Sequence, residues 1–341
     1  MSRFRKFTQS KSFLLIVLTL IILAIVFIVE PGAYNRGNAA QLMATLSYTG
    51  VMLCGIAMLL MSGGFDFSTS AQASVAMLIF AELVRRFPSV PFPIFMLCAL
   101  VFGVISGSIN AFFADGLGLM PFICTIGMSS VWSGLAALYT RGSTIPIRNA
   151  TFNSIAAQYV FGTPIPWTFV FALVLVLIYS GVVKYTRFGR SILMSGGNPT
   201  AARLAGLNPR KIQAMLFINN GVLAAVAGLI WASQQKMGSP TGFSTAGADM
   251  TCLTASILGG VSFMGGAGAL GGAFLGIILI QVLAYSLQVM GLPNWVITLI
   301  NGSLLVIAIS IDTFNVRRRM KKLGLKTASM GGPRMGMPGM R

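Results

Sequence analysis

The sequence predicts an all-α, polytopic membrane protein with about ten transmembrane helices, one of them a broken or re-entrant glycine-rich segment, and with both termini in the cytoplasm. The first observation is composition: of 341 residues, 55% are hydrophobic and 9% are charged, whereas a soluble domain carries about 25% charged residues. The second is the recurrence of apolar runs close to the ~20 residues that a spanning helix needs. The third is the clustering of Lys and Arg outside those runs.

The apolar runs divide the transmembrane domain, 13–312, into ten candidate spans. The first follows a basic cytoplasmic segment, 1–12; it is long for the apolar core of a signal peptide and lacks a small-residue cleavage site, so we expect a retained helix. The eighth is short and continues into a glycine-rich bend, which makes it the broken or re-entrant segment. In order, the spans are 13–29, 41–61, 68–84, 93–113, 122–139, 167–183, 212–233, 250–263, 270–290 and 295–311.

Basic residues collect in three places. Four of the 24 Lys and Arg residues precede the first span, six lie in the loop 184–211, and eight follow the last span in the tail 313–341. Cytoplasmic segments carry such an excess, and an even number of spans places all three on one side. Topology therefore accounts for the net charge of +18. We expect membrane lipid as a partner and no nucleic acid, and a cytoplasmic tail without fixed structure.

The chain lacks the residues that several kinds of catalysis and metal binding require. The chain has no histidine, which excludes Ser-His-Asp and Cys-His catalysis and His-ligated metal sites. The four cysteines lie in or beside apolar runs without CxxC spacing, which favours buried free thiols: Cys54, Cys98, Cys124 and Cys252. We predict no catalytic residue, no metal site and no cofactor on this chain.

The loop 184–211 carries the start and stop signals of a short helix. Asn198 is a suitable N-cap, and Pro199 is favoured at the first helical position. Good helix formers follow, and Gly206 ends the run. A capped helix of about two turns on a basic cytoplasmic loop indicates a contact for another protein.

Two loops on the opposite side are long or rich in turn formers. The loop 141–166 is polar and long enough to hold a short surface helix, and 234–249 contains several Gly, Ser and Thr residues. Long loops in compact domains are often functional. Plain connection and a docking surface for a soluble extracytoplasmic partner are both open.

A glycine pair, followed closely by an acidic residue, lies between the second and third spans. Gly63 and Gly64 precede Asp66, one of six acidic residues in the chain. Non-helical backbone at membrane depth survives only against protein or a water-filled cavity, and an ionisable group there is a functional candidate. Capping of the third span by Asp66 is the favoured interpretation; a contact with a transported solute is compatible with it.

A second glycine-rich stretch, 259–276, holds eight glycines in eighteen residues. It contains no lysine and therefore no P-loop. The four-residue spacing of Gly268, Gly272 and Gly276 favours close helix packing, within the bundle or across a dimer. Gly259-Gly260 follows an outside-to-inside span, as Gly63-Gly64 does, which suggests corresponding points of an internal duplication.

Polar residues within the spans complete the candidates. Buried amides in membranes usually bond between helices, and pore lining is the less common role. As candidates for a translocation pathway we take Gly63, Gly64, Phe65, Asp66, Ser68, Asn110, Asp249, Gly259 and Gly260.

Four segments occur in an order that resembles the permeases of ATP-binding-cassette (ABC) importers of the ribose/branched-chain type. They are MSGGFDFSTSAQASVAM at 61–77, MPFICTIGMSSVWSGLA at 120–136, GRSILMSGGNPTAARLAGLN at 189–208 and SILGGVSFMGGAGALGGAFLG at 256–276. The resemblance covers about 41–312. The chain departs from the sugar permeases in reading GGFDFSTSAQ where they tend to GGIDLSVGS.

The resemblance implies partners and a division of labour. It implies a dimer with a second permease, a solute-binding protein outside, and separate ATPase subunits that bind ATP and Mg. It also implies that the loop helix couples to the ATPase through Asn198, Pro199, Thr200, Ala201, Ala202, Arg203 and Gly206.

The expected function is that of a non-enzymatic permease subunit in the bacterial inner membrane that imports a monosaccharide or related small polar solute. A permease of the same type for nucleosides or branched-chain amino acids is an alternative. An ion-coupled secondary transporter is a further alternative, but it would require intramembrane carboxylates or histidines. A membrane enzyme lacks a nucleophile, base or metal cluster.

Overall fold

Each of the ten predicted spans contains a helix in the computed structural model, which describes residues 11–33, 35–243 and 247–322. The elements in order are α2 (Lys11–Val29), α3 (Arg36–Met61), α4 (Thr69–Arg86), α5 (Phe92–Ala111), η1 (Phe112–Gly116), α6 (Pro121–Thr140), β1 (Ile145–Pro146), α7 (Ala150–Ile155), α8 (Trp167–Tyr185), α9 (Arg187–Gly197), α10 (Pro199–Leu204), α11 (Pro209–Gln235), β2 (Met237–Gly238), α13 (Ala248–Leu258), α14 (Leu270–Val289) and α15 (Asn294–Lys322).

Within the described residues, eight helices are long and apolar enough to cross a membrane: α2, α3, α5 with η1, α6, α8, α11, α14 and α15. The remaining two predicted spans are α4 and α13. Most of α4 is buried among its neighbours, and three charged residues lie in its last turns. Helix α13 has 11 residues, about 16 Å, so it ends inside the bundle as a broken segment. The all-α polytopic fold is thus confirmed.

Helices α3 and α11 form the centre of the bundle. The second half of α3, from Leu46 to Met61, is buried without interruption. Helix α11 packs against α3, α4 and α5, and its approach to α5 depends on small residues. A Cβ on Gly103 or Gly107 would meet the backbone of α11, which is the close approach that glycines allow between membrane helices.

Close packing also joins α13 to α14, as the glycine spacing predicts. A Cβ on Gly272 would meet the backbone of Gly259, and one on Gly276 would meet the carbonyl oxygen of Ala255. The close approach therefore lies within this chain's own bundle.

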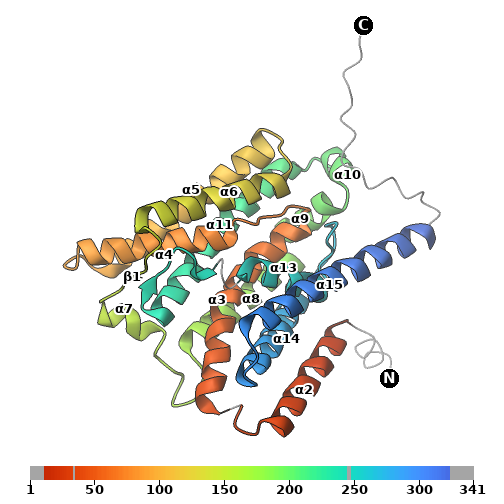
Figure 1. Cartoon of the computed structure of the whole chain (residues 1–341). Coiled ribbons are helices and arrows are strands. Elements are labelled where there is room, and N and C mark those ends of the chain that lie inside the picture. The colour runs from red at the N-terminus through yellow and green to blue at the C-terminus, as the bar shows by residue number, and fades with distance from the viewer. Residues whose placement is uncertain (1–10, 34, 244–246, 323–341) are drawn as a thin grey trace.

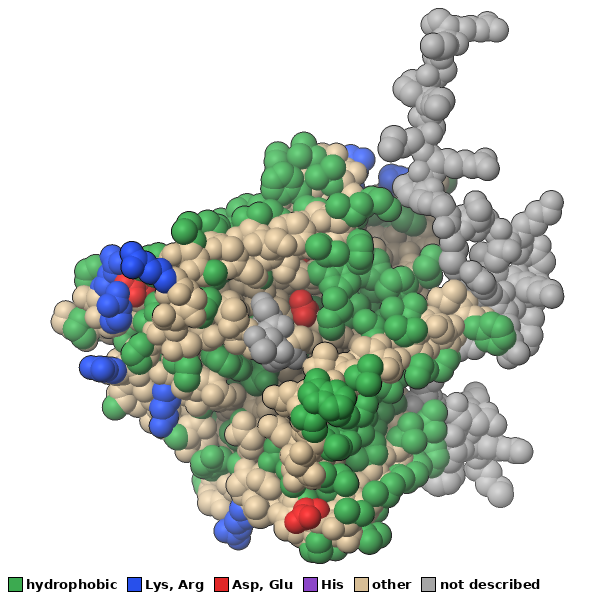
Figure 2. Space-filling model, viewed as in Figure 1, with side chains coloured by type: hydrophobic (Ala, Val, Ile, Leu, Met, Phe, Trp, Pro, Cys, Tyr) green, Lys and Arg blue, Asp and Glu red, His purple; other side chains and the backbone are tan. Residues whose placement is uncertain are grey.

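The outer helices expose apolar side chains. Helices α2, α6 and α15 carry many exposed Leu, Ile, Val and Phe residues, and Figure 2 shows hydrophobic side chains over much of the visible face. Such surfaces suit a bilayer, because lipid rather than water covers them.

The connecting segments gather at the two ends of the bundle (Figure 1). At one end, β1 pairs antiparallel with β2, with Ile145 opposite Gly238, and this joins the two predicted outer loops. The predicted short surface helix of the first loop is α7. At the other end lie α9 and α10. Which end is cytoplasmic stays a prediction from the charge distribution.

The last helix differs from its predicted bounds. Helix α15 continues to Lys322, beyond the predicted start of the tail at residue 313, because the Arg and Lys residues there are good helix formers. The rest of the predicted tail, from residue 323, lies outside the described residues.

Candidate functional site

The short helix in the loop 184–211 forms as its sequence signals predict. The side chain of Asn198 accepts hydrogen bonds from the backbone N–H groups of Thr200 and Ala201, at 3.1 and 3.0 Å. Pro199 occupies the first turn of α10, and Gly206 adopts a positive φ of 81° just after its end. The local capping signals therefore match the observed start and end of α10.

Helix α10 is a protruding, mostly exposed element. Asn198, Pro199, Thr200, Ala201, Arg203 and Gly206 are exposed, and Ala202 is buried. Leu204 is 87% exposed, an apolar side chain at the end of a polar loop. One face of α10 thus packs on the protein while the other is open to contact.

A preceding helix, α9, was missed by the sequence reasoning, which recognised only the start signal at Asn198. Its own signal is Thr186, whose hydroxyl oxygen accepts a hydrogen bond from the backbone N–H of Gly189 at 3.1 Å. A Cβ on Gly189 would meet the carbonyl oxygens of Val182 and Val183. This glycine therefore permits the sharp turn from α8 into α9.

The end of α9 touches both glycine-rich turns of the chain. The backbone N–H of Gly266 donates to the carbonyl oxygen of Met61 at 2.8 Å, and Gly196 lies against both of these groups, since a Cβ there would meet each of them. Gly265 lies against Gly63 in the same way. We call this meeting of the turn after α3, the end of α9 and the turn after α13 the glycine junction.

Asp66 lies beside the glycine junction at the centre of a buried polar cluster. Its Oδ1 accepts from the backbone N–H and the hydroxyl of Ser68, at 2.8 and 2.6 Å. Its Oδ2 accepts from the side-chain amides of Gln72, Asn110 and Asn220, at 3.2, 3.2 and 2.9 Å. The carboxylate thus accepts five hydrogen bonds and joins α4, α5 and α11. It does more than the predicted cap, because Asn110 and Asn220 donate to it from α5 and α11.

The amides around Asp66 are themselves fixed in position. The Nδ2 of Asn110 also donates to Ser68 Oγ at 2.8 Å, and that of Asn220 donates to Thr69 Oγ1 at 2.8 Å. The Oδ1 of Asn220 lies against Gly55 of α3 and accepts no hydrogen bond from the described residues. Asn110 therefore bonds between helices, which was the favoured interpretation of the buried amides.

Asp66 and Asp249 line one narrow hollow, together with Gly64, Phe65 and Leu253 among others. The hollow offers about 10 Å³, room for about one water and nothing larger. The rings of Phe65 and Phe263 lie with centroids 4.9 Å apart beside it. The structure thus gathers seven of the nine pathway candidates: Gly63, Gly64, Phe65, Asp66, Ser68, Asn110 and Asp249.

The other two candidates, Gly259 and Gly260, lie at the end of α13. Gly259 packs against Gly272 of α14, and Gly260 has a positive φ of 95°, so both serve the turn. Asp312 of α15 was not among the predicted candidates; its Oδ2 accepts from the backbone N–H of Phe263 at 3.0 Å. The scarcity of acidic residues in the spans was the signal that could have found it.

Among the described residues no group of His, Cys, Asp and Glu side chains is arranged to hold a metal ion. The polar groups at the candidate site are one carboxylate held by hydroxyls and amides, a second carboxylate across a narrow hollow, and the backbone of two glycine turns. Hydroxyls, amides and carboxylates of this kind are hydrogen-bonding groups for a polar molecule.

Most of the chain matches the sequences of a known protein family. Residues 38–309 match the family described as branched-chain amino acid transport system / permease component. The galactose/methyl galactoside import permease protein of Haemophilus influenzae is 27% identical over 315 residues, which cover 88% of this chain and 93% of the relative. The ribose import permease protein of the same organism is 27% identical over 312 residues, 90% and 93% of the two chains.

A third relative is the fructose import permease protein of Rhizobium meliloti, 27% identical over 305 residues that cover 87% of this chain and 84% of the relative. No solved structure matches the chain significantly.

Proposed function

The chain belongs to the family of branched-chain amino acid transport system permease components, and from this premise we propose that it forms the membrane pathway of an ATP-driven importer for a monosaccharide or a related small polar solute. With eight long apolar helices among its described residues and with its bacterial relatives, it is a multi-pass protein of the bacterial inner membrane. The observation that carries the proposal is α10, a capped and exposed helix whose supporting helix α9 ends on the two glycine turns.

The relatives support a sugar as the solute. Their names specify galactose, ribose, fructose and arabinose import, and an ion-coupled transporter is not favoured by any of these names. The candidate pathway residues offer hydroxyls, amides and two carboxylates, which suit the hydroxyl groups of a sugar. A solute-binding protein outside the membrane selects the solute and delivers it to the loops joined by β1 and β2.

The chain acts as a transport component rather than an enzyme. Separate ATPase subunits bind ATP and Mg, and their closure moves α10. Because α10 follows directly on α9, and Gly196 of α9 lies against Met61 and Gly266, this motion reaches the turns after α3 and α13 together. The turn after α3 then separates from α13, which widens the narrow hollow between them and opens the pathway, and a second permease completes the pathway on its other side.

Reversal of charge on α10 tests the contact with the ATPase. Arg203 is exposed on α10, and we expect Arg203→Glu to lower both the recovery of ATPase subunits with the purified permease and solute uptake by about tenfold. The matched control is Arg148→Glu, an exposed arginine in the loop at the opposite end, which should leave ATPase recovery unchanged. Normal ATPase recovery and uptake in the Arg203→Glu variant would contradict the assignment of α10.

A further inference from the structure

Two hollows meet at the surface where α4 and α6 end near β1. The first is an apolar groove of about 300 Å³ between the two helices, lined chiefly by Val75, Leu78, Ile79, Leu83, Trp132 and Leu135. The second, about 370 Å³, lies beyond it and includes Arg85, Arg86, Thr140 and Thr144. Glu82 and Tyr139 line both, so an apolar groove continues into a polar, basic opening.

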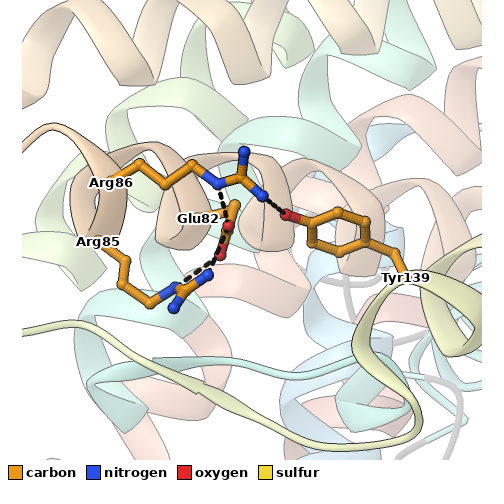
Figure 3. Close-up of polar contacts among 4 residues, drawn as sticks. All are labelled: Glu82, Arg85, Arg86 and Tyr139. Atoms are coloured by element: carbon orange, nitrogen blue, oxygen red, sulfur yellow. Dashed lines mark hydrogen bonds and ion pairs between the residues drawn. The ribbon is translucent and has the colours of Figure 1, made fainter.

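One carboxylate holds two arginines at this opening (Figure 3). Glu82 accepts from Nε and Nη2 of Arg85 at 2.8 and 2.7 Å and from Nε of Arg86. Nη2 of Arg86 donates to the hydroxyl of Tyr139 at 2.9 Å. These bonds fix the side chains of Arg85 and Arg86, which remain 58% and 56% exposed.

The opening therefore keeps an excess positive charge. Its lining residues include two guanidinium groups and one carboxylate, which leaves a net charge of about +1. Each guanidinium has five N–H donors, and fewer than half of them are used by Glu82 and Tyr139. The remaining donors suit the oxygens of a singly charged phosphodiester, which arginine binds well.

We propose that this surface is a binding site for an anionic glycerophospholipid, with one acyl chain in the groove between α4 and α6 and the phosphodiester on Arg85 and Arg86. The arrangement matches such a lipid in three respects. The apolar groove suits an acyl chain, Tyr139 is a residue typical of the membrane interface, and the positive charge of the two arginines offsets the negative charge of the phosphodiester. An acidic soluble protein would use the arginines but not the groove, which is why the lipid fits better. On the predicted topology the site belongs to the outer leaflet.

Lipid retention measured by native mass spectrometry tests the proposal on the full chain purified in detergent. The probes are phosphatidylglycerol, phosphatidylcholine and the water-soluble glycerol 3-phosphate. We expect Arg85→Gln/Arg86→Gln to reduce binding of phosphatidylglycerol about tenfold, with little change for phosphatidylcholine. The control Arg36→Gln/Arg187→Gln removes two other exposed arginines and should retain the lipid. Glycerol 3-phosphate should bind far more weakly, since it has no acyl chain.

A second variant tests the groove without touching the charges. Leu135 is 49% exposed in the groove wall, so Leu135→Trp can fill the groove without entering the core, and it should also weaken retention of phosphatidylglycerol. Equal retention of phosphatidylglycerol by wild type and both variants would overturn the proposal. So would equal binding of glycerol 3-phosphate, which would show a bare anion site. Unchanged lipid binding together with lost stimulation by a solute-binding protein would assign the arginines to protein docking instead.

Discussion

Asp66 concentrates the polar chemistry of the bundle at a single residue. Its carboxylate accepts five hydrogen bonds, and its exposed fraction is 7%. A buried charge is tolerated only when hydrogen bonds replace the lost water. The five donors meet that condition, so Asp66 holds α4, α5 and α11 together.

Replacement of Asp66 by Asn is expected to loosen this cluster. The new amide keeps one acceptor oxygen and turns an NH2 group toward donors, and each buried donor left unpaired costs about 1–3 kcal/mol. We expect the melting temperature of the detergent-purified permease to fall by about 5 °C or more, measured by the loss of its monodisperse peak after heating.

Glu30→Gln is the matched control, because Glu30 is exposed after the end of α2 and its replacement should leave the melting temperature unchanged. A stable Asp66→Asn variant that no longer imports sugar would contradict the structural role and indicate direct contact with the solute.

Sequence could identify Asp66 but not its partners. An acidic residue beside a glycine pair within apolar spans is conspicuous in a chain with six acidic residues. Its partners Asn110 and Asn220 lie 44 and 154 positions away, and only the packing of α5 and α11 against α4 brings them in. Long-range partners of this kind leave no local pattern.

At the scale of elements, α9 links the exposed α10 to the turns that follow α3 and α13. Local signals were sufficient for α10, whose cap, proline and terminal glycine are consecutive in the sequence. They were insufficient for the glycine junction, because it depends on three segments whose backbones approach one another only in the folded bundle. The sequence suggests that Gly63-Gly64 and Gly259-Gly260 are corresponding points of an internal duplication. In the structure, Gly63 lies against Gly265, which belongs to the turn after α13.

A methyl group at the glycine junction should impair transport more than assembly. In Gly196→Ala the new Cβ would meet Met61 and Gly266. Such overpacking costs about 1–3 kcal/mol, which is enough to shift the two turns without unfolding the bundle. We expect ATPase subunits to copurify normally while the solute imported per ATP hydrolysed falls at least about fivefold.

The control for this variant is Gly181→Ala on α8, where an added Cβ has nothing within 4 Å. It should transport normally. If Gly196→Ala imports as much solute per ATP hydrolysed as the wild type, the glycine junction does not transmit motion from α10. If the complex with the ATPase no longer assembles, Gly196 is a packing residue only.

For the whole molecule, composition and the recurrence of apolar runs of spanning length predicted the architecture well. All ten spans contain a helix, eight of the described helices are long and apolar enough to cross a membrane, and the short eighth span holds the 11-residue α13, because length and polarity are properties of each segment by itself. The extension of α15 to Lys322 was not predicted, since apolarity marks where the membrane ends and not where a helix of basic residues ends.

Orientation is the property of the whole molecule that the charge distribution predicts and that chemical labelling can measure. Arg203 and Arg148 are exposed at opposite ends of the bundle. In intact cells, a membrane-impermeant thiol reagent should label Arg148→Cys, and it should label Arg203→Cys only after the membrane is opened. The wild-type chain is the background control, because Cys54 and Cys252 are buried and Cys98 and Cys124 lie in apolar helices. The reverse labelling pattern would invert the topology and place α10 out of reach of any cytoplasmic ATPase. Labelling of both sites in intact cells would mean that the number of crossings between residues 148 and 203 is even, against the single crossing by α8 that the positive-inside distribution requires.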